Sequence, residues 1–309
     1  MKLAILMATF NGDRYLKEQI ESLLNQEYNN FCVYFSDDGS TDSTLRIINE
    51  YCTRYPDKFY NLNNKEKHGS ARDNFIYLLK NVNAELYMFC DQDDVWLPNK
   101  VKMTIEAYNT IIKKSSNNIP VAVYSDLHVV DSNLNILYQS FEKDCLQFKQ
   151  NRKNWKFRLL RNDCAGCTLL INLALVKVFK DNYRYINIKN IMMHDHFFIL
   201  IASLIGIAKY IDEPLILYRQ HGDNSVGALN KNLKNENVER INIHKTCLQN
   251  NEVLKMNLNL SQKQIRFLNK YIQLDKKSNF YIFAFLIFYR MLFSTIKNNL
   301  SFLKKILIG

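Results

Sequence analysis

The sequence predicts an α/β fold: a mainly parallel sheet with flanking helices, followed by a helical appendage at the C-terminus. Strand-like apolar runs alternate with segments of helical spacing up to about residue 125. This alternation is typical of parallel sheets that are covered by helices on both faces. After residue 227 Asn and Lys become frequent and the pattern turns helical. We therefore expect an α/β domain over residues 1–227 and a basic helical region over residues 228–309.

The expected strands in the front half are short and apolar. They cover residues 3–8, 31–35, 59–62, 86–90 and 121–125. Helical spacing of apolar residues separates them. Ser40 is the expected N-cap of the second helix, and Pro98 is expected in the first turn of the helix that follows the fourth strand.

The middle of the chain is less regular. Asp131, between two alternating runs, marks a hairpin, and residues 164–171 are expected to form a buried strand. An apolar helix should cover residues 197–205, and two short strands should cover residues 208–211 and 215–218.

Composition restricts the class of protein. The chain has 309 residues, 47% of them hydrophobic, which is enough for one large domain with an appendage. The seven scattered cysteines favour reduced thiols in the cytoplasm over a disulfide framework. The apolar start of the chain stops at Asn11-Gly12, so we interpret it as a first strand and not as a signal peptide.

Polar clusters follow three of the expected strands, at residues 9–11, 37–38 and 91–94. Ligands of open parallel sheets bind beyond the carboxyl ends of the strands, where these clusters should meet. Thr9, Asn11 and Asp38 are therefore candidates for contact with a ligand, and a carboxylate such as Asp38 could accept a hydrogen bond from a base.

The third cluster is acidic. Asp91, Asp93 and Asp94 could hold Mg²⁺ or Mn²⁺ with open positions for the oxygens of a diphosphate, whose negative charge the ion neutralises. The alternative is a solvated acidic turn, or a charge cluster at the start of the helix near Pro98. The convergence of three polar strand ends favours the metal site.

Four motifs together resemble one known family. They are Ala8-Thr9-Phe10-Asn11-Gly12, Ser36-Asp37-Asp38-Gly39-Ser40-Thr41-Asp42, Gly69-Ser70-Ala71-Arg72 and Asp91-Gln92-Asp93-Asp94-Val95-Trp96. The chain is similar in them to the family 2 glycosyltransferases with the GT-A fold, over roughly residues 1–227. The Gln-Asp-Asp-Val-Trp run, His194-Asp195-His196 and Tyr218-Arg219-Gln220-His221-Gly222 look more narrowly like bacterial rhamnosyltransferase-type members.

The resemblance implies an inverting transfer of a sugar from a nucleotide-sugar donor. It implies that Thr9 and Asp38 contact the nucleobase region and that Arg72 lies near the nucleotide. Asp93 and Asp94 would contact ribose and metal, with Asp91 close by.

Asp195 matches the family's catalytic acidic position, where Glu-Asp is common, and would deprotonate the acceptor hydroxyl. This chain has His194 in place of the Glu, which leaves the role of that position open. The alternative for Asp195 is an N-cap of the helix over residues 197–205.

Several other residues are further candidates for the site. His221 is a metal ligand, a diphosphate contact, or a structural histidine. Gly166 permits close approach of the acceptor, Trp96 stacks on a sugar or anchors a helix, and His194 lies near the acceptor. Zinc binding by His194 and His196 is disfavoured, because residues two apart on a helix point in different directions.

The C-terminal region carries most of the positive charge. Residues 228–309 contain fourteen Lys and Arg against four Asp and Glu, out of a net charge of +11. Residues 280–289 and 302–308 are apolar but shorter than the roughly 20 residues that span a bilayer. We expect peripheral contact with the membrane; a helical cap on the catalytic domain and a dimer contact are the alternatives.

These observations predict a metal-dependent glycosyltransferase of bacterial cell-surface polysaccharide synthesis, located in the cytoplasm at the inner face of the plasma membrane. The resemblance favours dTDP-rhamnose as donor, then UDP-hexoses, with a glycan or lipid-linked glycan as acceptor. A nucleotidyltransferase is disfavoured, because the first strand-helix turn has only Gly12. A nucleic-acid-binding protein is disfavoured because the front domain is nearly neutral, and a non-catalytic sugar-binding relative because the carboxylate set is intact.

Overall fold

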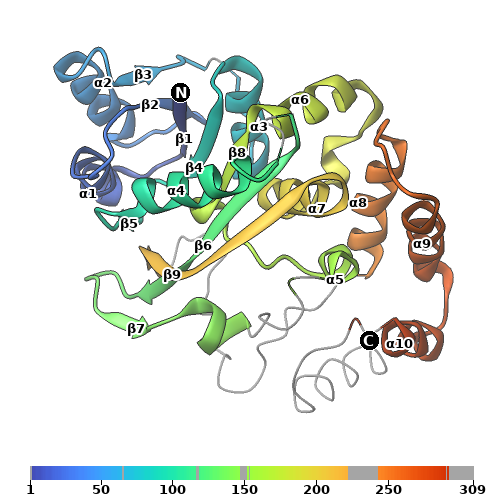
Figure 1. Cartoon of the computed structure of the whole chain (residues 1–309). Coiled ribbons are helices and arrows are strands. Elements are labelled where there is room, and N and C mark those ends of the chain that lie inside the picture. The colour runs from blue at the N-terminus through green and yellow to red at the C-terminus, as the bar shows by residue number, and fades with distance from the viewer. Residues whose placement is uncertain are drawn as a thin grey trace.

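The computed structural model describes residues 2–64, 66–115, 118–146, 152, 154–221, 243–289 and 291. Within them a nine-stranded sheet runs in the order β3-β2-β1-β4-β8-β6-β9-β5, with β7 paired to β6 (Figure 1). The strands are β1 (Leu3–Thr9), β2 (Phe31–Asp37), β3 (Phe59–Asn61), β4 (Leu86–Cys90), β5 (Val95–Trp96), β6 (Val121–Val130), β7 (Ile136–Tyr138), β8 (Leu170–Asn172) and β9 (Ile207–Arg219).

The expected mainly parallel α/β architecture is confirmed. β1 pairs in parallel with β2 and β4, β2 with β3, and β6 with β9. The short β8 joins the two halves by antiparallel pairing with β4 and β6. The carboxyl ends of β1, β2 and β4 consequently meet at one edge of the sheet, as the polar clusters predicted.

Helices cover both faces of the sheet. They are α1 (Asp13–Leu24), α2 (Thr44–Arg54), α3 (Ala71–Asn81), α4 (Lys100–Ile112), α5 (Trp155–Leu160), α6 (Leu173–Asn182), α7 (His194–Ile205), α8 (Ile243–Lys255), α9 (Gln262–Ile272) and α10 (Asn279–Phe288).

Alternation along β1 divides the core into two layers, because successive side chains of a strand point to opposite faces. Leu3, Ile5 and Met7 pack with α1, α2 and α4. Ala4 and Leu6 face the other layer, which contains α3, α5, α6 and α7. Every one of these five side chains is fully buried, as expected for a strand covered on both faces.

Four local predictions were wrong in detail. Ser43, not Ser40, is the N-cap position of α2, and the Ser40 hydroxyl oxygen instead accepts from the Asn11 backbone N–H while its proton goes to Asp37. Pro98 precedes α4 and its N-cap Asn99. Residues 164–171 form a 3₁₀ turn (Gly166–Thr168) followed by β8, and residues 207–219 form the single strand β9.

The hairpin around Asp131 is confirmed by the antiparallel pairing of β6 with β7.

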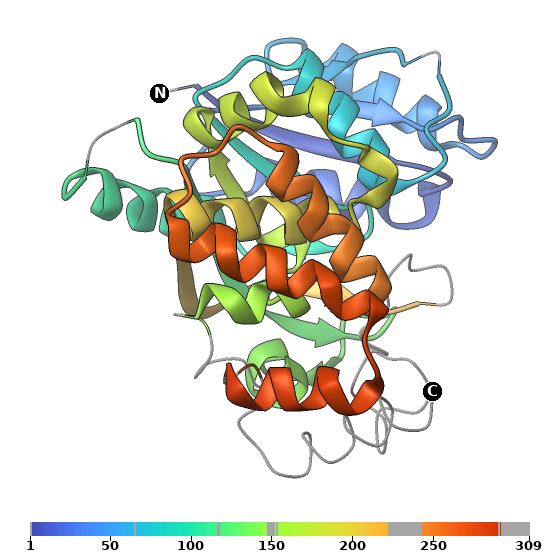
Figure 2. The same ribbon diagram turned by 90° about the vertical axis from the view of Figure 1, so that its right-hand side faces the viewer.

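The boundary that we expected near residue 228 lies outside the described residues, as does the apolar segment 302–308. Beyond it, α8, α9 and α10 lie one after another over the side of the molecule that carries α5 and α7 (Figure 2). Ser261 and Gln264 form a capping box that begins α9, and Ser278 caps α10. Leu268 and Tyr271 of α9 belong to the same buried cluster as the residues of α7.

Replacing Leu268 by Ala should lower the free energy of unfolding by about 2–5 kcal/mol, because the fully buried side chain would leave a cavity in this shared core. Urea unfolding followed by circular dichroism measures the change.

Leu45→Ala on α2 is the matched control, since Leu45 is 38% exposed. It should shift the free energy by about 0.5 kcal/mol. Equal effects of the two variants would show that α9 is not part of the cooperative core.

Candidate active site

The turn after β2 is built around Asp37. Its carboxylate accepts a hydrogen bond from Thr9 Oγ1 and another from the Ser40 backbone N–H, each at 2.8 Å. Gly39 has a φ of +85°, a conformation that residues with a Cβ rarely adopt. Thr9 therefore lies at the expected strand end, but its hydroxyl donates to Asp37 and stabilises the turn.

Asp38 faces the loop that leads into α3. Its carboxylate accepts hydrogen bonds from the backbone N–H groups of His68 and Gly69, the latter at 2.8 Å. A carboxylate offers about four acceptor positions, so Asp38 keeps capacity for a ligand donor. Asp38 is 8% exposed, which places it at the wall of the site and not on the open surface.

Gln92 joins the end of β1 to the end of β4. Its side-chain amide accepts from Phe10 N and donates to Phe10 O, both at 2.9 Å. Asn11 continues the connection, since its Oδ1 accepts from the backbone N–H of Thr41 at 2.8 Å. The three strand-end clusters are thus held to one another by direct hydrogen bonds, and Asn11 acts within this framework.

Arg72 lies in the first turn of α3 and is engaged by the protein itself. Its Nε donates to Asp73 Oδ1 at 2.7 Å, and its Nη1 donates to the carbonyl oxygen of Ile191 at 2.6 Å. The side chain therefore joins α3 to the segment that precedes α7. Asp73 Oδ2 also accepts from Nη2 at 3.0 Å, so the pair is bidentate.

The acidic cluster after β4 is crowded and largely buried. Burial first, and then the charges of Asp93 and Asp91, raise the pKa of Asp94 well above its usual range. Burial, then Asp93 and Asp195, raise the pKa of Asp91 to about 7. Within the described residues Asp94 Oδ2 is buried without a hydrogen-bond partner. A divalent cation would compensate this buried carboxylate oxygen and the repulsion among the three carboxylates.

One group of potential metal ligands stands out in the described part of the chain. Single ligand atoms of Asp91, Asp94 and Cys167 all lie within 4.8 Å of one another. Asp93 and His221, which we expected as ligands beside Asp94, pair with each other: His221 Nε2 lies 2.8 Å from Asp93 Oδ2. The two carboxylates fit Mg²⁺ or Mn²⁺, which both prefer oxygen ligands, and the Cys167 thiol is the weaker donor because burial raises its pKa.

Arg219, at the end of β9, holds the acidic loop from behind. Its backbone N–H donates to Asp94 Oδ1 at 3.1 Å, and its Nε donates to the Asp93 carbonyl oxygen at 2.8 Å. The remaining guanidinium nitrogens donate to the Ser132 carbonyl oxygen at 2.6 Å and to the Glu18 carboxylate. Arg219 is 1% exposed, so it is a structural support of the site and not a surface cation.

Trp96 does not reach the acceptor position that we considered for it. It is 2% exposed in β5, and Lys100 Nζ lies 3.5 Å from the centre of its ring. Burial lowers the pKa of Lys100 to about 7, although the nearby Cys167, Cys90 and Asp94 oppose this shift. Trp96 therefore anchors the start of α4, which is the second of the two roles considered above.

Asp195 lies in the first turn of α7, and burial raises its pKa to about 6. Its Oδ1 accepts from the His196 backbone N–H at 2.6 Å, and the N-cap position belongs to Met193. A Cβ on Gly166 would lie 3.0 Å from His194 Nε2 and 3.5 Å from Asp195 Oδ2, so the backbone at Gly166 packs closely against both side chains. The charge of Asp195 contributes to the raised pKa of Asp91, so the two carboxylates lie within electrostatic reach of each other.

His194 and His196 turn toward different partners. The His194 ring lies 4.4 Å from the ring of Phe75 and 4.8 Å from that of Phe89, and burial lowers its pKa to about 3. His196 Nε2 lies 2.6 Å from the Arg158 carbonyl oxygen. His194 is 2% exposed and therefore lies beneath the site, which corrects its placement at the acceptor.

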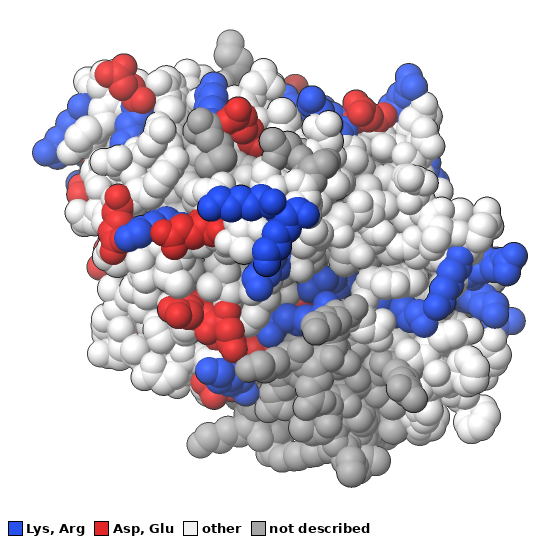
Figure 3. All heavy atoms as spheres, in the orientation of Figure 1, with Lys and Arg blue, Asp and Glu red and all other residues white. Residues whose placement is uncertain are grey.

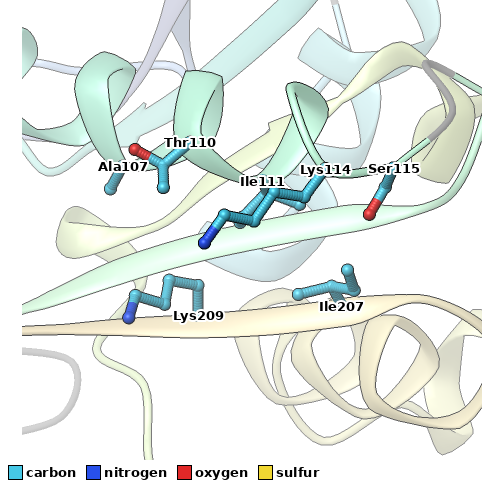
Figure 4. Close-up of a pocket in the computed structure, with 7 residues that line it drawn as sticks. All are labelled: Ala107, Thr110, Ile111, Lys114, Ser115, Ile207 and Lys209. Atoms are coloured by element: carbon cyan, nitrogen blue, oxygen red, sulfur yellow. The ribbon is translucent and has the colours of Figure 1, made fainter.

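A cavity of about 440 Å³ lies away from these residues (Figure 4). It is lined by Ala107, Thr110, Ile111, Lys114, Ser115, Ile207 and Lys209. These residues come from the end of α4 and the start of β9, whereas the acidic cluster contacts the last residue of β9. The cavity therefore belongs to the opposite edge of the sheet.

Sequence reasoning identified Asp91, Asp94 and Asp195 but gave no separate role to Arg219, Gln92 or Lys100. A charged residue at the end of an apolar strand was the available signal for Arg219. Cys167 was interpreted as core packing, and it does lie in the core while also facing the carboxylates.

Comparison with known proteins points to one family. Residues 4–179 match the sequence profile of Glycosyl transferase family 2. The dTDP-rhamnosyl transferase RfbG of Shigella flexneri is 34% identical over 230 residues, which cover 72% of this chain and 74% of that protein. An uncharacterized glycosyltransferase of Rickettsia typhi is 30% identical over 59% of this chain and 55% of its own length.

Solved structures share the fold at low sequence identity. S. aureus TarS 1–349 in complex with UDP-GlcNAc matches with a TM-score of 0.57 and 18% identity, over 88% of this chain and 70% of that chain. The mannosyltransferase PcManGT from Pyrobaculum calidifontis, in complex with GDP-Man and Mn²⁺, matches with a TM-score of 0.55 and 11% identity, over 88% and 69%.

Arg219→Lys should weaken Mn²⁺ binding by about 10–100-fold, because lysine cannot bridge Asp93, Ser132 and Glu18 at once and the acidic loop loses its support. Calorimetric titration with MnCl₂ in the presence of a nucleoside diphosphate measures the affinity.

Arg46→Lys on the surface of α2 is the control, since Arg46 makes only an exposed pair with Glu50 at 3.8 Å. Unchanged affinity in Arg219→Lys, with the control also unchanged, would contradict a positioning role for Arg219.

Proposed function

The chain belongs to Glycosyl transferase family 2 and has the GT-A fold, and from this premise we propose that it transfers a sugar from a nucleotide-sugar to an acceptor hydroxyl with inversion at the anomeric carbon. The observation that carries the proposal is the meeting of two kinds of carboxylate at one edge of the sheet. The half-buried Asp91 and the fully buried Asp94 form an acidic pair, and the charge of Asp195, whose own pKa is raised, adds to the raised pKa of Asp91.

The donor nucleotide would lie over the ends of β1 and β2. Asp38 retains acceptor capacity for the nucleobase, and Thr9 and Asn11 shape the floor through their bonds to the turn residues. Arg72 stands at the start of α3, whose N-terminus attracts negative charge. Asp93 would face the ribose from the acidic loop.

Asp91 and Asp94 would hold Mg²⁺ or Mn²⁺, with Cys167 as a third donor and Asp93 and His221 close by. When bound, such an ion neutralises the charge that develops on a departing diphosphate. The buried and unpartnered Asp94 Oδ2 fits this role, because an uncompensated carboxylate oxygen in the interior is costly.

Asp195 would act as the general base. A base must be ionised to accept the proton of the acceptor hydroxyl, and a pKa raised to about 6 makes Asp195 a stronger base than an ordinary carboxylate while leaving it ionised at neutral pH. Gly166 has no side chain where it packs against Asp195, and the acceptor would approach this carboxylate from the side of Gly166.

For the donor we propose dTDP-rhamnose before UDP-hexoses, on the basis of the 34% identity to a dTDP-rhamnosyl transferase. The acceptor would be a glycan or a lipid-linked glycan of a bacterial cell-surface polysaccharide. Such an acceptor places the reaction at the cytoplasmic face of the plasma membrane, with the basic C-terminal region as the membrane contact.

The donor proposal predicts selective stabilisation in the presence of MnCl₂. A ligand that binds only the native state raises the melting temperature, and dTDP-rhamnose should raise it more than UDP-glucose, UDP-GlcNAc or GDP-mannose. A thermal-shift screen measures this order. Stronger stabilisation by a UDP-hexose would replace the donor assignment and leave the reaction class intact.

In the same screen Asp94→Asn should lose the metal-dependent part of the shift, whereas Asp57→Asn, at an exposed position, should retain it. Equal shifts in the two variants would remove Asp94 from the metal site.

Asp195→Asn should lower the turnover number by about 10²–10⁴-fold, the usual contribution of a general base, while donor stabilisation in the thermal-shift assay is retained. Transfer of radiolabelled sugar to acceptor measures turnover, and Asp57→Asn again serves as the control.

The pH profile provides a second readout of the same assignment. Protonation removes the base, so kcat/KM of the wild-type enzyme should fall as the pH drops through about 6. A profile that stays flat well below that pH, or near-normal turnover by Asp195→Asn, would exclude Asp195 as the base.

A further inference from the structure

α10 carries an unusual concentration of exposed apolar side chains. Phe280 is 74% exposed, Phe288 is 77% exposed, and Tyr281 and Ile287 are about half exposed. Among the described residues, these are four of the ten large hydrophobic side chains that are exposed. Soluble monomers rarely gather exposed apolar residues in one place, so this concentration indicates an interaction surface.

The exposed residues form one stripe along the helix. Positions 280, 281, 284, 287 and 288 fall on one face at helical spacing. The opposite face is buried against the body of the protein through Ile282, Phe285 and Leu286. We name the outward side chains of Phe280, Tyr281, Ile287 and Phe288 the aromatic stripe. α10 is thus anchored on one side and apolar on the other.

Spanning a bilayer is excluded for α10 by its length. It has ten residues, which extend about 15 Å, and a span needs about 20 residues. No helix in the described part of the chain combines the length and apolarity that crossing requires. A helix of this kind instead suits the boundary between headgroups and acyl chains, where aromatic side chains enter and the backbone stays parallel to the surface.

Positive charge flanks the aromatic stripe. Lys276 and Lys277 directly precede α10, and Lys277 Nζ lies 5.5 Å from the centre of the Tyr281 ring. Exposed Lys263, Arg266 and Lys270 lie on α9. Figure 3 shows Lys and Arg gathered on the right over the position of α9, with an uncharged surface below them over α10.

The charge balance of this region favours an anionic partner. Residues 243–289 contain seven Lys and Arg against two Asp and Glu. One of the two acids, Glu252, is buried and paired with Lys255 at 2.8 Å, and the other, Asp275, lies 2.9 Å from His244. Two copies of this chain meeting through α10 would bring like charges together, which disfavours self-association.

We propose that the aromatic stripe of α10, with the Lys and Arg side chains of α9 and residues 276–277, docks on the surface of a bilayer that contains anionic phospholipid. The stripe enters the headgroup boundary, and the basic side chains contact phosphate and other anionic headgroups. This inference deepens the proposed function, because it names the surface that contacts the membrane. It rests on that function in one respect, namely that docking brings the enzyme to an acceptor held in the same membrane.

Co-sedimentation of the full chain with vesicles tests the proposal. Wild-type protein should pellet with phosphatidylcholine vesicles that contain phosphatidylglycerol, and much less with phosphatidylcholine alone or at high salt. The double variant Phe280→Ser and Phe288→Ser should bind the anionic vesicles at least about tenfold more weakly, because two phenylalanine side chains no longer enter the bilayer.

The double variant Ile136→Ser and Leu137→Ser is the matched control. These side chains are 47% and 43% exposed on β7, away from α10, and the control should bind as the wild type does. A triple variant Lys263→Gln, Arg266→Gln and Lys270→Gln should lose binding to anionic vesicles while its weak binding to neutral vesicles stays unchanged.

Donor-induced thermal stabilisation of the α10 variant should equal that of the wild type, which separates failure of docking from failure of the enzyme. Equal sedimentation of the α10 variant and the wild type would overturn the proposal. Dimerisation of the wild type without vesicles, lost in the α10 variant by analytical ultracentrifugation, would also overturn it and assign the stripe to a second copy of the chain.

Discussion

Arg219 provides the connection on which the candidate site depends. Through its backbone N–H and guanidinium it holds Asp94 and Asp93 to the end of β9, and it reaches α1 through Glu18. Because the side chain is almost completely buried, these bonds act in a medium of low dielectric constant and are strong. The guanidinium donates to the carbonyl oxygens of Asp93 and Ser132 and to the Glu18 carboxylate, so it fixes the position of the acidic loop through its backbone.

The raised pKa values of Asp91, Asp94 and Asp195 follow from this enclosure. Burial is the first cause for all three, and mutual repulsion adds to it for Asp91 and Asp94. Buried carboxylates that lie close together repel one another when ionised, and a bound cation relieves this repulsion. Strongly shifted pKa values of this kind are found more often at functional sites than elsewhere. In the proposed reaction the same burial would serve two purposes, attracting the metal ion and making Asp195 a better base.

In this proposal the front sheet and the C-terminal helices have different functions. The front sheet would hold the soluble nucleotide-sugar at the carboxyl ends of its strands, as open α/β sheets do. The helices α8 to α10 would hold the enzyme near an acceptor that cannot leave the membrane. Leu268 and Tyr271 join these helices to the α7 core, so the first turn of α7, which carries Asp195, belongs to the same packed layer.

The resemblance to the family, and not the local pattern, singles out Asp195. Local pattern was sufficient to predict the parallel front sheet and the strand-end clusters with Asp91 and Asp94, because periodicity and strand ends are properties of neighbouring residues. It failed where partners distant in sequence decide the outcome. The Ser40 oxygen accepts from Asn11 and does not cap α2, and Trp96 is buried in the core cluster with Lys100 of α4 over its ring. Only the tertiary structure brought Cys167 to Asp94, and Arg219 to the acidic loop 125 residues earlier in the chain, since hydrogen bonds and burial depend on distances that spacing along a chain does not contain.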